Sequence, residues 1–344
     1  MTYSPRITAT PDTWIDPHGQ PQVGLFQDSI PRFNLEALDL RNEMDSKASR
    51  WRRHFGYKQF QFVAVQSPDF VLALAIADVR YVNSGFAYLY RKGMPTLELS
   101  LLHPLAWRCQ MSQSPRQGTA RLGTPSHGWH LTPSDEGWRV QLNHPRLQVE
   151  LLLHRADQAA LALCSPTAYS GFTYTEKNNA LAVSGQLLLD GQALDLAQAR
   201  GGYDFSAGYM RRQTSWRWAS INTELASNSG QRVPFGLNLA AGVNETGLCE
   251  NAWWLDGQRQ HLSPAQFEFD RRVSGTWRIR TLCDELDLHF TPDFCRQERL
   301  NLGLLASNFR QYVGYFSGQL KKPDGSVILL DQVQGFTEDH YAKW

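Results

Sequence analysis

The chain repeats one pattern of strand-like segments, and this repeat limits its possible folds more than any other feature of the sequence. The apolar run Phe70–Ala77 returns as Phe235–Gly242. The segment Ser184–Leu187 returns as Ser317–Leu320, and each copy is followed by an Asp-Gly pair between apolar runs, as in a β-hairpin turn. Because the two matches occur in the same order, the sequence predicts an internal duplication.

The two matches are spaced differently, which locates an insertion in the first copy. The apolar runs lie 165 residues apart, whereas the Ser-Gly-Gln-Leu segments lie 133 residues apart. The first copy therefore contains about 30 additional residues between these positions. The segment from Pro104 to about Gly137 is rich in serine, glutamine, proline and glycine, so we expect residues 104–137 to form a long surface loop that covers one domain.

Short apolar or alternating runs dominate the chain after residue 50, and no long helical stripe occurs there. Strands are predicted at Phe60–Val65, Phe70–Ala77, Gly85–Tyr90, Thr96–Leu102, Val149–His154, Ala160–Cys164 and Leu181–Leu189. We expect an all-β protein with two tandem antiparallel β domains, residues 51–205 and 206–344. An N-terminal arm, residues 1–50, precedes them and carries one short helix, Asn34–Ser49, with Asn34 as its cap.

The composition excludes several classes of partner. The chain has 34 basic and 33 acidic residues, a net charge of +1, so we expect no binding to nucleic acid or to anionic membranes. The longest apolar run, Phe70–Ala77, is far shorter than the roughly 20 residues of a membrane helix. The N-terminus has neither a basic region nor an apolar stretch for export, so we expect a cytoplasmic protein.

The five cysteines are widely spaced and form no Cys-x-x-Cys pair. This pattern argues against a disulfide framework and against a thiolate zinc site, and we interpret the cysteines as buried thiols. His103, His127 and His130 are a weak metal signal, because a single His-x-x-His in a loop seldom binds metal. We predict no metal site.

Four segments together resemble a bacterial family catalogued as domain of unknown function 2804. They are Thr214–Ser220, Phe235–Gly242, Glu250–Gly257 and the closing Glu338–Trp344, and the similarity extends from about Gly19 to the C-terminus. The family has no established activity, so the resemblance implies membership without implying catalytic residues.

A second resemblance concerns the architecture alone. Two tandem antiparallel β domains of this length resemble the double lipocalin-like proteins that include hydroxyneurosporene synthase and its AttH-type relatives. The resemblance implies two lipocalin-like β-barrels, and members of that group bind or transform apolar molecules. It transfers no site residue to this chain.

The repeat register places Asp204 opposite Glu338, so that each copy ends in Gly-x-x-carboxylate. Two carboxylates at equivalent places could meet between the domains, where burial and mutual repulsion would separate their pKa values for acid and base roles. His340 lies beside Glu338 and is a candidate general acid, although a histidine near the C-terminus is also commonly a surface residue. The alternative for the carboxylates is an ordinary structural ion pair.

Arg211 and Arg212 follow Asp204 in a glycine-rich stretch that leads into a strand. We expect one guanidinium to point inward and the other toward solvent. The inward group must be paired, because an unpaired buried charge is very costly. It could bind a ligand carboxylate through two hydrogen bonds, or it could pair with Asp204.

The second copy is richer in polar side chains than the first. Asn238 lies within an apolar run, and its amide needs partners if it is buried. The candidate ligand-binding residues around it are Trp216, Trp218, Asn244, Glu250 and Asn251. A polar pocket is one interpretation of this set; core tryptophans and satisfied core amides are the other.

No Gly-x-Ser-x-Gly, phosphate-binding glycine loop or dinucleotide fingerprint is present, which sets aside serine hydrolases, kinases and NAD enzymes, and we predict no cofactor. The leading hypothesis is a soluble protein that binds an apolar or amphipathic small molecule, with hydration or isomerisation as its chemistry if it is an enzyme. A non-enzymatic lipid or pigment carrier is the first alternative. A carbohydrate-binding protein with exposed tryptophans is the second.

Overall fold

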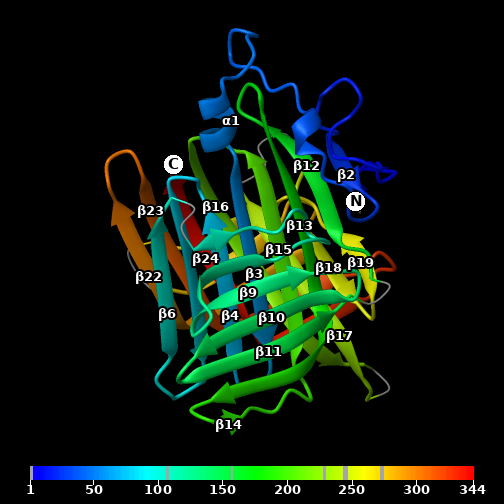
Figure 1. Ribbon diagram of the computed structural model, residues 1–344. Coiled ribbons are helices and arrows are strands. Elements are labelled where there is room, and N and C mark those ends of the chain that lie inside the picture. The colour runs from blue at the N-terminus through cyan, green and yellow to red at the C-terminus, as the bar shows by residue number, and fades with distance from the viewer. Residues whose placement is uncertain (1–2, 106–107, 156–157, 228–229, 243–246, 272–274) are drawn as a thin grey trace. The chain divides into compact units, whose positions relative to one another are not determined.

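A computed structural model describes the chain except for residues 1–2, 106–107, 156–157, 228–229, 243–246 and 272–274 (Figure 1). Its contacts divide the chain into two compact units. The N-terminal unit is residues 7–211, and the C-terminal unit is residues 212–344 together with residues 1–6. Both units consist almost entirely of antiparallel β-strands.

The N-terminal unit is built on one long sheet with the strand order β6-β5-β4-β3-β15-β13-β11-β10-β9-β8-β7. The bounds are β3 (Lys58–Gln66), β4 (Val71–Asp78), β5 (Val82–Tyr90), β6 (Leu97–Pro104), β7 (Cys109–Gln110), β8 (Ala120–Thr124), β9 (His127–Pro133), β10 (Gly137–His144), β11 (Leu147–His154), β13 (Gly171–Leu189) and β15 (Arg200–Tyr209). Figure 1 shows β9, β10 and β11 side by side across this sheet.

Four short or peripheral strands complete this unit: β1 (Ile7–Thr8), β2 (Gly24–Phe26), β12 (Leu161–Thr167) and β14 (Gln192–Ala193). β2 pairs with β12, and β12 pairs with β13. The sheet also curls on itself, because the Trp129 indole on β9 donates a hydrogen bond to the Ala75 carbonyl on β4 at 3.0 Å. The result is a nearly closed barrel.

The C-terminal unit is a sheet of nine strands with the order β19-β18-β17-β16-β24-β23-β22-β21-β20. The bounds are β16 (Gln213–Ala226), β17 (Arg232–Ala241), β18 (Ala252–Leu255), β19 (Gln258–His261), β20 (Ala265–Glu268), β21 (Trp277–Thr281), β22 (Leu286–Asn301), β23 (Ala306–Lys321) and β24 (Val327–Lys343). β20, at one edge, contacts β17 near the other, so this sheet also curls toward closure.

The two strand orders match and confirm the predicted fold of two lipocalin-like sheets from an internal duplication. Reading outward from β15 in one sheet and β24 in the other, nine strands correspond in order, and β7 and β8 are additional in the N-terminal unit. Gly185 on β13 and Gly318 on β23 have φ values of 117° and 145°. A Cβ there would lie 2.1 Å from the Glu150 carbonyl oxygen and 2.2 Å from that of Asp287, so the repeated glycine has the same steric cause in both units.

Each unit buries an apolar core on the inner face of its sheet. Leu72 and Leu74 on β4 and Leu237 and Leu239 on β17 are fully buried in their respective cores. They lie two residues apart because successive side chains of a strand point to opposite faces. This alternation is the reason that the apolar repeat could be read from the sequence.

The predicted helix Asn34–Ser49 is wrong. The chain forms only a short 3₁₀ turn, η1 (Leu35–Ala37), and the helix of this region is α1 (Arg50–Gly56), which Ser49 caps by accepting a hydrogen bond from the Arg52 amide at 3.2 Å. The Asn34 side chain instead bonds the backbone amide of Ile15 at 2.8 Å and its carbonyl at 2.9 Å. A tertiary contact therefore uses the amide that the sequence suggested as a cap.

The expectation of a long loop at residues 104–137 holds only in part, because β7, β8 and β9 take up 14 of these 34 residues. Leu122, Trp129 and Leu131 are buried, and their stabilisation by the core outweighs the turn-rich composition. The connection between β7 and β8 is irregular, and there Ser112 accepts hydrogen bonds from the Gln59 and Gln61 amides at 2.9 and 2.6 Å. The insertion thus extends the sheet and fills one end of the barrel.

The cysteines agree only in part with the interpretation as buried thiols. All five are free, but Cys164 alone is fully buried, and the other four are half-buried. Among the described residues, no helix is both long enough and apolar enough to cross a membrane.

Candidate functional site

Three adjacent strands of the C-terminal unit, β16, β24 and β23, carry polar groups on both faces. Trp216, Glu338 and His340 lie on one face, whereas Arg217 and Asp339 alternate with them and lie on the face of the apolar core. We call these the outer face and the inner face. Each presents a distinct cluster.

The inner-face cluster is centred on Asp339, whose side chain is only 8% exposed. Arg217 approaches it at 3.1 Å, and Arg271 binds both of its oxygens, at 2.9 and 3.2 Å. Arg310 lies 3.4 Å from it. Three guanidinium groups therefore share one carboxylate, which leaves an excess of positive charge at this end of the barrel.

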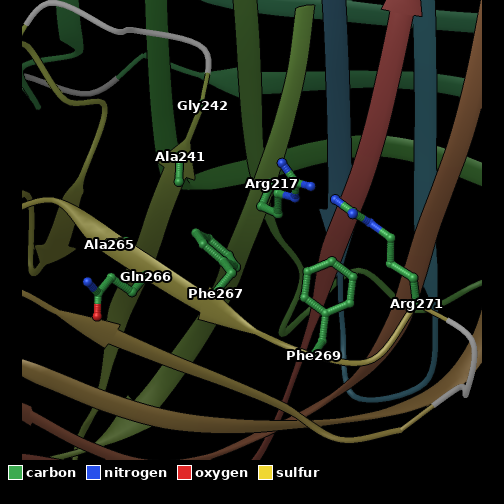
Figure 2. A pocket seen from close by; sticks show the side chains of 8 residues that line it. All are labelled: Arg217, Ala241, Gly242, Ala265, Gln266, Phe267, Phe269 and Arg271. Atoms are coloured by element: carbon green, nitrogen blue, oxygen red, sulfur yellow. The ribbon is translucent and has the colours of Figure 1, made fainter.

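A pocket of about 450 Å³ adjoins this cluster. Figure 2 shows the guanidinium groups of Arg217 and Arg271 pointing toward one another beside the rings of Phe267 and Phe269. The Phe269 ring stacks on Trp277 at 3.7 Å, and the Arg271 guanidinium lies 5.6 Å from the Phe269 centroid. The pocket therefore combines a cationic wall with an aromatic wall.

The outer-face cluster is centred on Glu338. Its carboxylate accepts hydrogen bonds from the Trp216 indole at 2.7 Å and from the Gln311 amide at 2.8 Å. His340 Nδ1 lies 3.8 Å from the nearer oxygen of Glu338. The carboxylate is thus fixed by two neutral donors and has an imidazole beside it.

The His340 ring is held between two aromatic side chains and contacts a serine. Its centroid lies 4.2 Å from that of Trp216 and 5.1 Å from that of Phe309. Its Nε2 lies 3.0 Å from Ser307 Oγ, in a hydrogen bond whose donor depends on the tautomer. Glu338, His340 and Ser307 therefore form a continuous series of a carboxylate, an imidazole and a hydroxyl.

Asp204 lies on β15 of the N-terminal unit, where it pairs with Lys177 and accepts a hydrogen bond from Ser206 at 3.1 Å. The alternative of pairing with a basic residue thus applies to Asp204, although the partner is a lysine rather than the predicted arginines. In the cross-strand register, Asp204 faces Lys177 and Phe62.

Glu338 occupies the corresponding register position in the C-terminal unit, facing Gln311 and Trp218. The equivalence of Asp204 and Glu338 that the repeat indicated therefore holds at the level of strand register. We also expected the Asp204 and Glu338 side chains to lie close together between the two domains. That expectation stays a prediction.

Asn238 and Asn251 are fully buried, and their side chains bond mainly to the backbone. Asn238 accepts a hydrogen bond from the Trp218 indole at 2.7 Å and donates one to the Glu250 carbonyl at 2.5 Å. Asn251 accepts from the Ala240 amide at 2.7 Å. These contacts fasten β17 to the segment before β18 and favour the interpretation as satisfied core amides.

Asn251 also donates to the Ser263 carbonyl at 3.1 Å, and Glu250 is buried. None of the lining residues of the pocket beside Arg217 is among these buried polar residues. Asn244 lies outside the described residues.

The expected inward arginine is not Arg211 or Arg212. Both are exposed at the connection between β15 and β16, and the Arg212 carbonyl accepts a hydrogen bond from the Trp344 amide at 3.0 Å. Arg217 is the arginine that points inward, because it lies within β16 on the face of the core. Arg211 and Arg212 precede β16, which begins at Gln213, so neither takes the inner face of the strand.

The sequence analysis did not identify one buried carboxylate of the N-terminal unit. Glu176 on β13 is fully buried and accepts hydrogen bonds from Tyr174 at 2.7 Å, from Tyr203 at 2.8 Å and from Ser29. Burial, and then the Glu176 carboxylate, raise the pKa of Tyr203 well above its ordinary value. No local motif indicates this cluster, because Ser29 lies far away in the sequence.

The inner-face cluster and Ser307 were also missed. Arg217 and Asp339 lie within segments that the sequence analysis had identified. Because Arg217 follows Trp216 and Asp339 follows Glu338, the alternation of a strand would have placed both on the face opposite to Trp216 and Glu338. In the described part of the chain, no group of three or more His, Cys, Asp and Glu side chains is arranged to hold a metal ion.

Two curled antiparallel sheets in tandem give the chain a double lipocalin-like fold. It belongs to the family described as domain of unknown function 2804, which matches residues 5–344. No curated protein matches the sequence.

Two solved structures resemble the fold. One is a putative AttH protein from Nitrosomonas europaea, with a TM-score of 0.46 and 10% identity, covering 85% of this chain and 93% of that one. The other is kievitone hydratase from Nectria haematococca, with a TM-score of 0.45 and 10% identity, covering 83% of this chain and 88% of that one. At this identity the likeness concerns the fold alone.

Proposed function

We propose that the C-terminal unit binds a small amphipathic molecule that carries an anionic group, in the pocket beside Arg217 and Arg271. One observation supports this proposal above all: three arginines converge on the single carboxylate of Asp339 at the pocket. Among the described residues of this cluster, Asp339 is the one acidic partner that the three arginines share. A ligand carboxylate would compensate them.

The geometry of the two walls indicates the class of ligand. A guanidinium binds a carboxylate through two parallel hydrogen bonds, and such charge-assisted bonds are among the stronger ones in proteins. Phe267 and Phe269 would contact the apolar part of the same molecule. A volume of about 450 Å³ suits an aliphatic or aromatic carboxylic acid of modest size.

This arrangement accounts for binding without requiring catalysis, so the carrier hypothesis and the enzyme hypothesis share it. The carbohydrate hypothesis has less support. Among the described tryptophans, Trp51 alone is strongly exposed, at 74%, and one ring does not make a sugar platform.

Calorimetric titration with decanoate and with decanol tests the proposal. The wild-type protein is expected to bind decanoate more tightly than decanol, because only the acid engages the arginines. Arg271→Ala should weaken decanoate binding about tenfold or more, the effect of losing a charged hydrogen bond of about 1.5–3 kcal/mol, and leave decanol binding nearly unchanged.

Arg278→Ala is the matched control. Arg278 belongs to the same unit, pairs with Asp287 and does not line the pocket. Equal affinity for decanoate in the wild type, Arg271→Ala and Arg278→Ala would contradict the proposal.

A further inference from the structure

We infer that Ser307 is a nucleophile activated by His340 and Glu338, and that the outer face of the C-terminal unit accepts acyl groups from carboxylic esters. The inference is independent of the proposed ligand pocket, because that pocket adjoins the inner face. It rests on the position of three side chains on two paired strands.

The strand register brings the three groups together. Glu338 and His340 are two residues apart on β24 and share a face, and Phe309 on β23 is the cross-strand partner of His340. Ser307, two residues before Phe309, is therefore a diagonal neighbour of His340. Because all three lie on paired strands rather than on loops, their geometry is set by the sheet.

Two aromatic rings and one hydrogen bond hold the imidazole. Trp216 and Phe309 hold the ring, and Nε2 points at Ser307 Oγ at 3.0 Å. Among the described residues, Nδ1 is buried without a hydrogen-bond partner, and the Glu338 carboxylate lies 3.8 Å from it. A small approach would complete that bond, and such bonds are often long before a substrate binds.

The fixed carboxylate has a clear role in this arrangement. Trp216 and Gln311 hold Glu338 in place, so it can stabilise the imidazolium that forms when His340 accepts a proton. Glu338 is thus a positioning residue, and His340 is the base that accepts the proton of the Ser307 hydroxyl. Ser307 is half-buried and the His340 side chain is 13% exposed, so the pair is not sealed from solvent.

The reaction is an acyl transfer. Ser307 Oγ attacks the ester carbonyl carbon and its proton passes to His340 Nε2; the bond to the leaving alcohol then breaks and that proton passes to the alcohol oxygen. Water attacks the acyl-serine in the second half, with His340 again as the base, and releases the carboxylic acid. No oxidant, reductant or metal is needed for the balance.

The sequence set serine hydrolases aside because it contains no Gly-x-Ser-x-Gly. That motif describes one fold, whereas the same constellation recurs on unrelated folds and is identified by geometry. Ser307 follows Ala306 at the start of β23 and has no sequence signature of its own.

A fluorophosphonate probe with peptide mapping tests the inference. The probe should label Ser307 in the wild-type protein, and His340→Gln should slow the labelling at least about 100-fold, the effect of losing a general base. Ser317 is the internal control: it lies on the same strand, but its Oγ accepts a hydrogen bond from the Gln332 amide at 3.1 Å and it should stay unlabelled. Arg278→Ala should leave the labelling unchanged, because Arg278 pairs with Asp287 and belongs to neither site.

Ser307→Ala gives a second measurement if His340→Gln does not fold, since it removes one half-buried hydroxyl. It should abolish hydrolysis of 4-nitrophenyl butyrate. The inference is overturned if Ser307 is not labelled, if labelling is equal at Ser307 and Ser317, or if Ser307→Ala hydrolyses the ester at the wild-type rate.

Discussion

The two units contain the same central strands, yet three equivalent cross-strand positions on their inner faces carry different chemistry. In the N-terminal unit these positions hold an amide, an aromatic ring and a carboxylate, and in the C-terminal unit they hold an aspartate between two arginines. The residues are Gln61, Phe205 and Glu176 in the first case and Arg217, Asp339 and Arg310 in the second. The same backbone thus holds a filled end with one hydrogen-bonded carboxylate in one copy and an arginine-rich end beside a pocket in the other.

The side chains that fill this end of the N-terminal barrel come from segments that have no equivalent in the C-terminal unit. Trp14 and Phe33, from the segment before the first barrel strand, pack against rings of β13 and β15, with Phe33 lying 5.7 Å from Phe205. Ser112 enters from the insertion and bonds Gln61. One barrel end is thus part of a core, whereas its equivalent adjoins the pocket beside Arg217.

The largest effect should come from removing the ring that fills the N-terminal barrel. Trp14 is fully buried, contacts Phe172 at 5.2 Å and donates a hydrogen bond to the Cys164 thiol at 3.3 Å. Trp14→Ala is expected to lower the free energy of unfolding of this unit by about 3–5 kcal/mol, because it leaves a large cavity. Urea denaturation measures this change.

Trp51→Ala is the control, because Trp51 is 74% exposed and its removal should cost far less. If the two variants were equally stable, the N-terminal segment would not be part of the core, and the contrast between a filled and an open barrel would fail.

The equivalent pair Glu176 and Arg310 sharpens the comparison. Glu176→Ala leaves the hydroxyls of Ser29, Tyr174 and Tyr203 without their acceptor and is expected to cost about 2–4 kcal/mol. Arg310→Ala should cost less than about 1 kcal/mol, since two other arginines still bind Asp339. The denaturant midpoints of both variants, measured side by side, test this difference. Equal losses of stability in Glu176→Ala and Arg310→Ala would show that both barrel ends are structural.

The fold could be predicted because it depends on alternation and repetition, which are local. The run Phe70–Ala77 and its copy Phe235–Gly242 became β4 and β17, equivalent strands in the two sheets. Even the equivalence of Asp204 and Glu338 followed from counting residues, because an antiparallel sheet preserves register.

The site was less predictable, because its contacts join residues that are distant in sequence. The Ser29 contact with Glu176 spans 147 residues, and the Ser307 contact with His340 spans 33. The sequence indicated Glu338 and His340 from their chemistry, but the serine that lies beside the imidazole is determined by the pairing of β23 with β24. The choice of Arg211 and Arg212 instead of Arg217 failed because both lie in the exposed connection before β16, whereas Arg217 lies within the strand and takes its inner face.

The smallest effect concerns acid stability of the C-terminal unit. His261 on β19 lies opposite Ala252, and burial, followed by the nearby charge of Arg259, lowers its pKa to about 4. The ordinary value of about 6.5 applies to the unfolded chain, so between pH 6.5 and 4 the unfolded state binds the additional proton. Stability is therefore full above pH 6.5 and is lost as the pH falls toward 4.

His261→Gln should remove this loss, which we expect to be about 1–2 kcal/mol between pH 6.5 and 4 after allowance for partial exposure. The unfolding transition of the C-terminal unit, followed by urea titration at several pH values, should become flatter in that window while the N-terminal unit is unchanged. His289→Gln is the matched control, because His289 is exposed on β22 of the same unit. A flatter profile in His289→Gln, or an unchanged one in His261→Gln, would mean that the acid sensitivity of this barrel arises elsewhere than at His261.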